Sequence, residues 1–444
     1  MLLCVVLMGF GASAEAQASS RVFAVGDPGL VTATAPVGEG VVWAATPPGQ
    51  PSVVARTDAA GTRELGRFPA GERSEPAVRL QAVDGQVGVT RTEGVCLDAH
   101  DCKYQLYSYV ATDLLAGPAD GALTRVGGCT SVRSCARRCE VPAAPELEVG
   151  GGAVAVVDPC AERATITEAD GTTRALTGAD EVRLAGPWAA VVRSSEPDTA
   201  VLLRRSDGAE VARLAGDYGV WLQADGTFVT RSLAPAARDV LRVAGPPDWA
   251  PRAIGPMSPY EQPAGLAGGR LLLLGSDAAG LRVTVRPVDG GPAIQRRLGW
   301  VSGRSLGFDG ARLTWPERPC AVTSVVSWDL DADPTPPRLP AACGAARVLD
   351  SSAVVRGGRV RLRIACAAQY AQGCNGILRV LGPGLRRWAW ERATLTPGQT
   401  ASRTLALPRE ALRTIRRRDR VRATAVFDAR HGPATRHPLV LAAG

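Results

Sequence analysis

The chain has 444 residues, 45% of them hydrophobic, with 50 Gly, 33 Pro and a formal net charge of +8. This apolar content excludes wholesale disorder, and the length exceeds that of a typical single domain, so two domains is the working estimate. Val, Leu and Ala occur in runs of about four to eight residues, which is typical of strands.

The chain begins with an apolar stretch, residues 2–10, followed by small residues and three overlapping Ala-x-Ala sites between Ala12 and Ala18. This is the pattern of a signal peptide, so we expect residues 1–18 to be removed on export. No Lys or Arg precedes the apolar stretch, so either the true start lies upstream or the n-region of the signal peptide is atypical. The alternative interpretation of this stretch is an N-terminal core strand. No later segment has the roughly 18 apolar residues of a membrane span. We expect a secreted or cell-surface-associated protein with no transmembrane segment.

The cysteines support export. Of 11 cysteines, Cys4 lies in the predicted signal peptide, which leaves an even number for disulfide bonds. These are Cys96, Cys102, Cys129, Cys135, Cys139, Cys160, Cys320, Cys343, Cys366 and Cys374. A zinc site formed by Cys129, Cys135, Cys139 and Cys160 is the alternative, but there is no C-x-x-C pair and the chain has only three His. We therefore predict five disulfides, no metal and no cofactor.

A turn-plus-strand unit recurs through the first 350 residues. A Gly, often preceded by Asp or Gly, opens an apolar run at Gly40, Gly85, Gly152, Gly186, Gly226, Gly269 and Gly310. The intervals are 34 to 45 residues, apart from one of 67 that contains a cysteine-rich insertion. Such Gly residues supply the positive φ angles of tight hairpin turns. A period near forty is typical of propeller blades or of a solenoid.

Each unit offers four strand-like runs, and the abundant Gly and Pro argue against a helical solenoid. The sequence therefore predicts an all-β fold with a seven-bladed β-propeller over residues 21–349. Six or eight blades remain alternatives, because residues 22–31 are placed to close the ring. The repeat is similar to the WD40-like and TolB-like class by its period alone, since no Gly-His or Trp-Asp signature recurs.

From residue 351 the strands become longer and alternate more regularly, which predicts an immunoglobulin-like β-sandwich over residues 351–444. The segment carries a C-x(6–8)-C-x-G pattern and a later basic stretch. The matching residues are Cys366, Cys374, Gly376, Leu412, Arg416, Arg417, Arg418 and Val421. In these it resembles the short Ig-like modules of exported proteins from high-GC actinobacteria. The resemblance implies an accessory or adhesive module and no catalytic residue.

The charge is divided between the two regions. Residues 351–444 contain 18 Arg and four acids, whereas residues 1–350 contain 33 basic and 39 acidic groups. The densest stretch contains Arg413, Arg416, Arg417, Arg418, Arg420 and Arg422. Guanidinium groups suit phosphate or carboxylate partners, and export makes nucleic acid an unsuitable target. One alternative is that these arginines have no binding role: the chain contains only one Lys, so Arg is its ordinary surface cation. The other is that the basic module docks on the acidic propeller.

No active site is visible in the sequence. Gly303-Arg304-Ser305-Leu306-Gly307 matches a G-x-S-x-G elbow but lacks the helix that should follow it. Paired carboxylates would have to come from loop acids such as Asp98, Asp101, Asp217, Glu261 and Asp277, which nothing distinguishes from solvated residues. Trp249, in a proline-rich loop, is the best candidate for an exposed binding aromatic.

These features favour a secreted, non-catalytic binding or structural protein, which we expect to be a monomer. The propeller would be the interaction platform, and the basic module would bind an anionic polysaccharide or other cell-envelope polymer or an extracellular protein. The alternative is a propeller-type extracellular enzyme, a polysaccharide lyase or glycosidase.

Blade geometry predicts some of the disulfides. The turn between the second and third strands and the connection after the fourth lie on one face of the ring. If Cys320 ends a second strand and Cys343 follows a fourth, both lie on that face, and we predict a disulfide between them. We also predict a disulfide between Cys366 and Cys374. Among the other six cysteines, we favour a disulfide between Cys96 and Cys102, and a disulfide between Cys96 and Cys129 is the alternative.

Overall fold

The computed structural model describes residues 20–444 except 27–29, 47–50, 70–76, 96–107, 130–143, 159–160, 162, 194, 217, 234–238, 259–260, 278–279, 299–304, 319, 334, 338–342, 371 and 431–433. The predicted signal peptide therefore lies outside the described residues. In the described part of the chain, no helix has the length and apolar character needed to cross a membrane.

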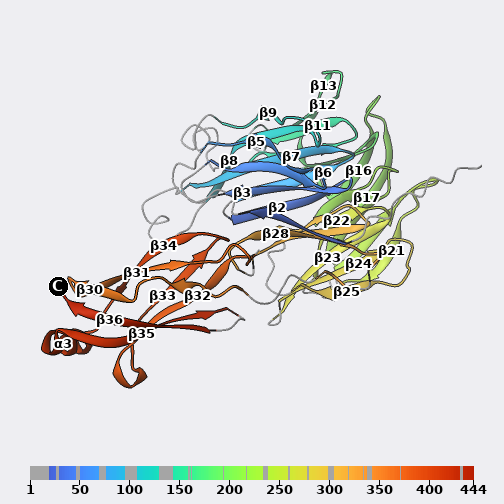
Figure 1. The fold of residues 1–444 in the computed structure, drawn as a ribbon. Coiled ribbons are helices and arrows are strands. Elements are labelled where there is room, and N and C mark those ends of the chain that lie inside the picture. The colour runs from blue at the N-terminus through green and yellow to red at the C-terminus, as the bar shows by residue number, and fades with distance from the viewer. Residues whose placement is uncertain are drawn as a thin grey trace, which may run out of the picture.

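Residues 21–329 form seven antiparallel sheets of four strands each (Figure 1). The first three blades contain β2 (Leu30–Val37), β3 (Gly40–Thr46), β4 (Val53–Asp58) and β5 (Gly61–Arg67); β6 (Ala77–Val83), β7 (Gln86–Val95), β8 (Ser108–Pro118) and β9 (Thr124–Gly127); and β10 (Glu146–Gly150), β11 (Ala153–Asp158), β12 (Arg163–Thr167) and β13 (Thr173–Thr177).

The next three blades contain β14 (Ala179–Ala185), β15 (Trp188–Arg193), β16 (Glu196–Arg204) and β17 (Glu210–Ala215); β18 (Tyr218–Leu222), β19 (Phe228–Leu233), β20 (Asp239–Ala244) and β21 (Arg252–Pro256); and β22 (Glu261–Ala267), β23 (Arg270–Asp277), β24 (Gly280–Pro287) and β25 (Ile294–Arg297). The seventh contains β26 (Gly307–Phe308), β27 (Arg312–Glu317), β28 (Thr323–Asp329) and β1 (Arg21–Gly26). The predicted seven-bladed β-propeller is confirmed.

The ring is closed by the N-terminal strand. β1 pairs antiparallel with β28, from Arg21 opposite Ser327 to Gly26 opposite Thr323, so it supplies the fourth strand of the last blade. Closure of this kind joins distant parts of the chain in one sheet and leaves only short edges.

The predicted Gly-opened turns join the first and second strands of the blades. Gly151 and Gly152 lie between β10 and β11, with φ angles of +55° and +77°. A Cβ atom at Gly151 would lie 1.9 Å from the Gly186 carbonyl oxygen of the next blade. Here glycine is required both by the backbone conformation and by the close approach of two turns.

These turns are also linked to one another by hydrogen bonds. The Asp84 carboxylate accepts from the backbone N–H groups of Gly151 and Gly186, both at 3.0 Å, and thereby ties three blades together. On the opposite side of the ring, the Gln223 side chain accepts from Gly269 N–H at 2.8 Å. These bonds join the first hairpin turns of neighbouring blades.

The core of the propeller lies between successive sheets. Val182 and Leu184 of β14 pack against Ala155 and Ile166 of the preceding blade, and all four are buried. In the seventh blade Trp315 and Trp328 are each 1% exposed. The alternating apolar residues that predicted strands from the sequence therefore form the contacts between blades.

The C-terminal domain contains eight strands, a 3-10 turn η2 (Pro383–Leu385) and one helix, α3 (Arg409–Arg418). The strands are β29 (Arg347–Val348), β30 (Ser352–Arg356), β31 (Arg359–Ala365), β32 (Cys374–Leu381), β33 (Arg387–Leu395), β34 (Thr400–Ala406), β35 (Arg420–Ala429) and β36 (Ala434–Ala443). Because β29 pairs with β31, this sheet begins before residue 351.

The predicted two-sheet immunoglobulin-like sandwich is not confirmed. All eight strands belong to one continuous sheet with the curvature of a half-barrel, in which β34 branches from β31. β30 is the joining strand, because it pairs in parallel with β36 and also meets β31 at their hairpin.

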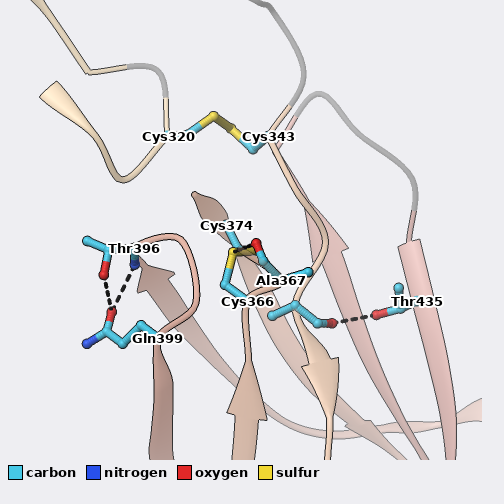
Figure 2. Close-up of a disulfide and its surroundings, with 9 residues drawn as sticks. Cys320, Cys343, Cys366, Ala367, Cys374, Thr396, Gln399 and Thr435 are labelled. Carbon is cyan, nitrogen blue, oxygen red and sulfur yellow. Dashed lines mark hydrogen bonds between the residues drawn. A yellow bond between two sulfur atoms is a disulfide. The ribbon is translucent and has the colours of Figure 1, made fainter. Parts of the chain in front are cut away.

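Two disulfides stand at the junction of the domains (Figure 2). Cys320 bonds to Cys343 and Cys366 bonds to Cys374, with Cα–Cα distances of 5.5 and 5.7 Å, as predicted. The β27–β28 turn also meets the C-terminal domain directly, because Ala321 N–H donates to the Gln372 carbonyl at 2.9 Å.

The strand assignment behind the Cys320–Cys343 prediction was wrong. Cys343 does not follow a fourth strand, because β1 supplies that strand and β28, the last propeller strand before Cys343, is the third. The segment after β28 instead leads to the C-terminal domain, where Cys343 N–H donates to the Arg430 carbonyl at 3.3 Å.

Candidate functional site

The seven innermost strands line a central cavity of about 770 Å³. Each contributes residues to its wall, including Thr34, Gln81, Glu148, Arg183, Trp221, Gly265 and Phe308. The volume lies within the range of roughly 300–1,000 Å³ usual for small-molecule sites. A cavity at the centre of the ring follows directly from seven sheets packed radially.

One wall of the cavity is polar and is formed by β6, β10 and β14. Glu148, which is 5% exposed, accepts a hydrogen bond from the Gln81 side chain at 2.8 Å and pairs closely with Arg183. Arg183 also pairs with Glu181 at 2.6 Å and donates to the Val220 carbonyl at 3.2 Å. This network joins four consecutive blades around the cavity.

Other polar groups on this wall have hydrogen-bond donors or acceptors that the described residues do not use. Arg79 approaches Glu148 only at 3.8 Å, and its side chain is 53% exposed. Glu146 likewise approaches Arg183 only at 3.8 Å. Within the part of the chain that the structure describes, Gln81 Oε1 is buried and has no hydrogen-bond partner. These three side chains offer donors and acceptors to a bound molecule.

The charges of the network affect one another. Burial raises the pKa of Glu181, and the adjacent Arg183 offsets part of this effect. The pKa of Arg183 is raised because its carboxylate neighbours, led by Glu148, outweigh its own burial. Arg183 therefore stays a permanent cation at the centre of the polar wall.

The rest of the cavity wall, from β18 to β26, is largely apolar. Trp221 of β18 and Phe308 of β26 are partly buried and line the cavity together with Leu266, Leu272, Leu274 and Leu306. The cavity is therefore divided into a charged side and an aromatic and aliphatic side.

A second candidate site lies on the C-terminal domain, at the end that faces away from the propeller (Figure 1). There α3, the β30–β31 hairpin, the β32–β33 turn and the beginning of β35 come together. Arg386 of that turn pairs with Glu410 of α3 at 2.7 Å, and Leu407 N–H donates to the Gly358 carbonyl of the hairpin at 2.9 Å.

We call this region the arginine tip. Its members are ten exposed arginines: Arg356, Arg359, Arg386, Arg387, Arg409, Arg413, Arg416, Arg417, Arg418 and Arg420. The same segments carry two acids, Glu410 and Asp419. One face of α3 is anchored by buried Ala411 and Ile415, which directs the arginines outward.

The structure thus brings together five of the six densest arginines named from the sequence, and it places Arg422 exposed on β35 beside them. The sequence did not predict that hairpin arginines distant in the chain would join them. The basic module does contact the propeller, at Ala321 and Cys320, but the arginine tip lies at the other end of that module (Figure 1).

Trp249 has a different environment from the one expected. It is partly buried, and its ring packs edge-to-face on Trp188 at a centroid distance of 5.8 Å. A binding role for it stays a prediction. Among the described residues, the exposed tryptophan is Trp390, which is 55% exposed on β33.

Ser305 does not have the geometry of a nucleophile elbow. It is 4% exposed, its carbonyl accepts from the Thr34 hydroxyl at 2.8 Å, and the short strand β26 follows it instead of a helix. Of the loop acids considered, Glu261 is buried against Thr284 and Arg282, whereas Asp98, Asp101 and Asp217 lie outside the described residues. Asp277 ends β23, at the hairpin to β24.

Cys129 is disulfide-bonded, so it is not free to act as a zinc thiolate, and its partner is not among the described residues. Cys96, Cys102, Cys135, Cys139 and Cys160 also lie outside them, so their predicted pairings stay predictions. Among the described residues there is no group of three or more His, Cys, Asp or Glu arranged to hold a metal ion.

Sequence reasoning missed Glu146, Glu148, Glu181 and Arg183. The available signal was their position: each lies in the strand preceding a Gly-opened turn, with acids at alternate residues 146 and 148 and charged residues at 181 and 183. The first strand of each blade is the innermost one, so charged residues in these strands indicate the wall of the central cavity.

No family model matches the sequence, and no curated protein matches it. Among solved structures, a streptogramin B lyase is 10% identical, with a TM-score of 0.41, over 69% of this chain and 96% of that one. The WD40 repeats of RRP9 are also 10% identical, with a TM-score of 0.39, over 70% and 97% of the two chains.

The β-propeller domain of the Trilobed protease from Pyrococcus furiosus is 9% identical, with a TM-score of 0.36, over 72% and 96%. At such values these likenesses carry no inference about the activity of this chain. The class that sequence repeat and structure define is that of seven-bladed β-propeller proteins, here with a C-terminal β domain.

Proposed function

We propose that this chain is an extracellular, non-catalytic binding protein that attaches to an anionic polymer of the cell envelope through its arginine tip. The carrying observation is the concentration of ten exposed arginines against two acids at the end of the C-terminal domain. Guanidinium groups form paired hydrogen bonds with phosphate and carboxylate groups, and so they suit a polymer that repeats such groups.

An extracellular location is supported by the two disulfides, since such bonds persist in oxidising compartments. The predicted signal peptide supports the same location. The propeller, held to the C-terminal domain by direct contacts, would then be presented at the envelope as an interaction platform.

We also infer that the C-terminal domain is immunoglobulin-like in its packing. β31 pairs with β29 and β34, while β33, β32, β35, β36 and β30 follow one another in the rest of the sheet. Val360 and Leu362 of the first group and Leu378 and Phe427 of the second share one buried cluster, as two packed layers would. This packing would give the arginine tip a rigid support.

The test uses the full chain and a long-chain inorganic polyphosphate as the probe. In the test variant Arg416, Arg417 and Arg418 are replaced together by Gln, which preserves helix propensity. In the matched control Arg63, Arg163 and Arg252, exposed on the propeller, are replaced in the same way and remove the same charge.

Calorimetric titration at low ionic strength should show binding by the native chain and by the control. The tip variant should bind at least tenfold more weakly, because it loses adjacent guanidinium groups. Equal loss in both variants would show that net charge alone drives binding, and no binding by the native chain would refute the proposal. Stronger binding to anionic lipid vesicles than to polyphosphate would assign the tip to a membrane instead.

A further inference from the structure

The central cavity carries an inference that is independent of the arginine tip. We propose that it binds a neutral, hydroxyl-rich ligand, a short saccharide, between its polar wall and its aromatic wall.

The polar wall has both hydrogen-bond donors and hydrogen-bond acceptors that are available to a ligand. Arg79 has N–H donors that no described residue accepts within hydrogen-bond distance, whereas Glu146 and the buried Gln81 Oε1 have free acceptor positions. A buried acceptor without a partner costs free energy, and a ligand that donates to it recovers that cost. A hydroxyl group both donates and accepts, so a ligand rich in hydroxyls suits a wall that offers both donors and acceptors.

The charges of the wall disfavour an ionic ligand. Arg183 is held by Glu181 and Glu148, and Glu148 also accepts from Gln81. An anion entering the cavity would meet these carboxylates, and a cation would meet Arg79 and Arg183. A neutral ligand leaves the ion pairs intact and avoids the cost of unpaired buried charge.

The rest of the cavity wall supplies the complementary apolar contact. Trp221 and Phe308 both line the cavity, from the fifth and seventh blades. The C–H face of a sugar ring packs on an aromatic ring, while its hydroxyls extend sideways to polar groups. A cavity of about 770 Å³ has room for such a ligand.

The experiment is a saturation-transfer difference NMR and calorimetry series on the full chain with three neutral disaccharides: cellobiose, maltose and N,N′-diacetylchitobiose. Glucuronic acid and the dipeptide Gly-Phe are the anionic and zwitterionic comparisons. We expect at least one disaccharide to bind more tightly than either comparison ligand, with an affinity that changes less than twofold between 50 mM and 500 mM NaCl.

Two variants locate the site. Trp221→Ala should weaken disaccharide binding at least tenfold by removing the aromatic contact, and Glu146→Gln, on a half-exposed side chain that makes no close ion pair, should weaken it about threefold. Trp390→Ala, an exposed tryptophan outside the cavity, is the matched control and should bind as the native chain does.

Absence of disaccharide binding by the native chain would overturn the inference, as would unchanged binding by Glu146→Gln and Trp221→Ala. Tighter binding of glucuronic acid or Gly-Phe would overturn the assignment of a neutral ligand. Because polyphosphate is bound at the arginine tip and Arg416, Arg417 and Arg418 lie outside the cavity, failure here leaves the proposed function unaffected, and the reverse also holds.

Discussion

Single glycines determine how closely the blades meet at their innermost turns. Gly151 has a φ of +55°, and a Cβ there would lie 1.9 Å from the Gly186 oxygen, whereas Gly171 has a φ of +84° with no atom within 4 Å of its Cβ position. Both replacements by Ala pay about 1–2 kcal/mol for a left-handed conformation. We expect Gly151→Ala to lower the free energy of unfolding by clearly more than Gly171→Ala, as measured by urea denaturation. Equal losses of unfolding free energy in the two variants would mean that the two turns move apart to admit the added methyl group without destabilising the fold.

The charge network beside the cavity predicts a pH dependence of the free energy of unfolding. Burial raises the pKa of Glu181 above its ordinary value, so its contribution to stability is present at low pH and is lost as the pH rises through the folded-state pKa. Replacing Glu181 by Gln removes that loss. The free energy of unfolding of Glu181→Gln, relative to the native chain, should therefore increase between pH 4 and pH 7 in urea denaturation.

Glu64 is the control, because its pKa is shifted in the opposite direction. A hydrogen bond from Arg67 lowers the pKa of Glu64, so its contribution is present above the unfolded-state pKa and is lost as the pH falls. Relative to the native chain, Glu64→Gln should lose stability as the pH rises over the same range. A shift of the same sign for both variants would contradict the assignment of Glu181 to a desolvated position.

The two tryptophans of β33 differ in burial, and the alternation of residues along a strand does not predict that difference. Trp388 and Trp390 are two positions apart, which in a regular strand places both on one face. The register shifts between Val380 and Leu381 of the partner strand, and Trp388 is left without a paired residue. As a result Trp388 is 8% exposed and Trp390 is 55% exposed. A bulge of this kind leaves no mark in the local sequence.

At the scale of elements, the repeat predicted the blades because each Asp-Gly or Gly-Gly turn has a local cause. Ring closure by β1 depends on a pairing across some three hundred residues, and the sequence indicated it only as an alternative use of residues 22–31. For the same reason Cys343 was placed after a fourth strand that another part of the chain supplies. The arginine tip was predicted in its helical part alone, because its hairpin arginines reach it through tertiary pairing.

The Cys320–Cys343 disulfide is a covalent link at the junction of the two domains, beside the hydrogen bonds there. It closes a sequence separation of 23 residues between the β27–β28 turn and the entry to the C-terminal domain. Chain entropy assigns about 3 kcal/mol to a loop of this size. With both cysteines replaced by Ser, calorimetry should show a lower Tm and unfolding in two separate transitions.

Replacing Cys366 and Cys374 by Ser is the matched control for that prediction, because this disulfide closes only 8 residues within one domain. It should lower the stability of the C-terminal domain without separating the transitions. A single, unshifted transition in the Cys320→Ser, Cys343→Ser variant would show that the hydrogen bonds at the junction suffice to couple the domains.

At the scale of the whole molecule, the two candidate sites differ in physical character and in place. The cavity has its central charges paired, so binding of a neutral ligand there should respond weakly to salt. The arginine tip is exposed, and interactions of exposed charges are screened over about 8 Å at physiological ionic strength. A chain that carries both would attach by one end and keep its propeller free for a second ligand.

The central claim, that the arginine tip carries anion binding, is tested most directly by the salt dependence of polyphosphate binding. The logarithm of the association constant should fall linearly with the logarithm of the salt concentration, by on the order of 0.7 for each phosphate neutralised on a single-stranded polyanion. Replacement of Arg416, Arg417 and Arg418 by Gln should therefore reduce the slope by about 2, and replacement of Arg63, Arg163 and Arg252 should leave it unchanged. The same slope for the native chain and the tip variant would contradict the claim.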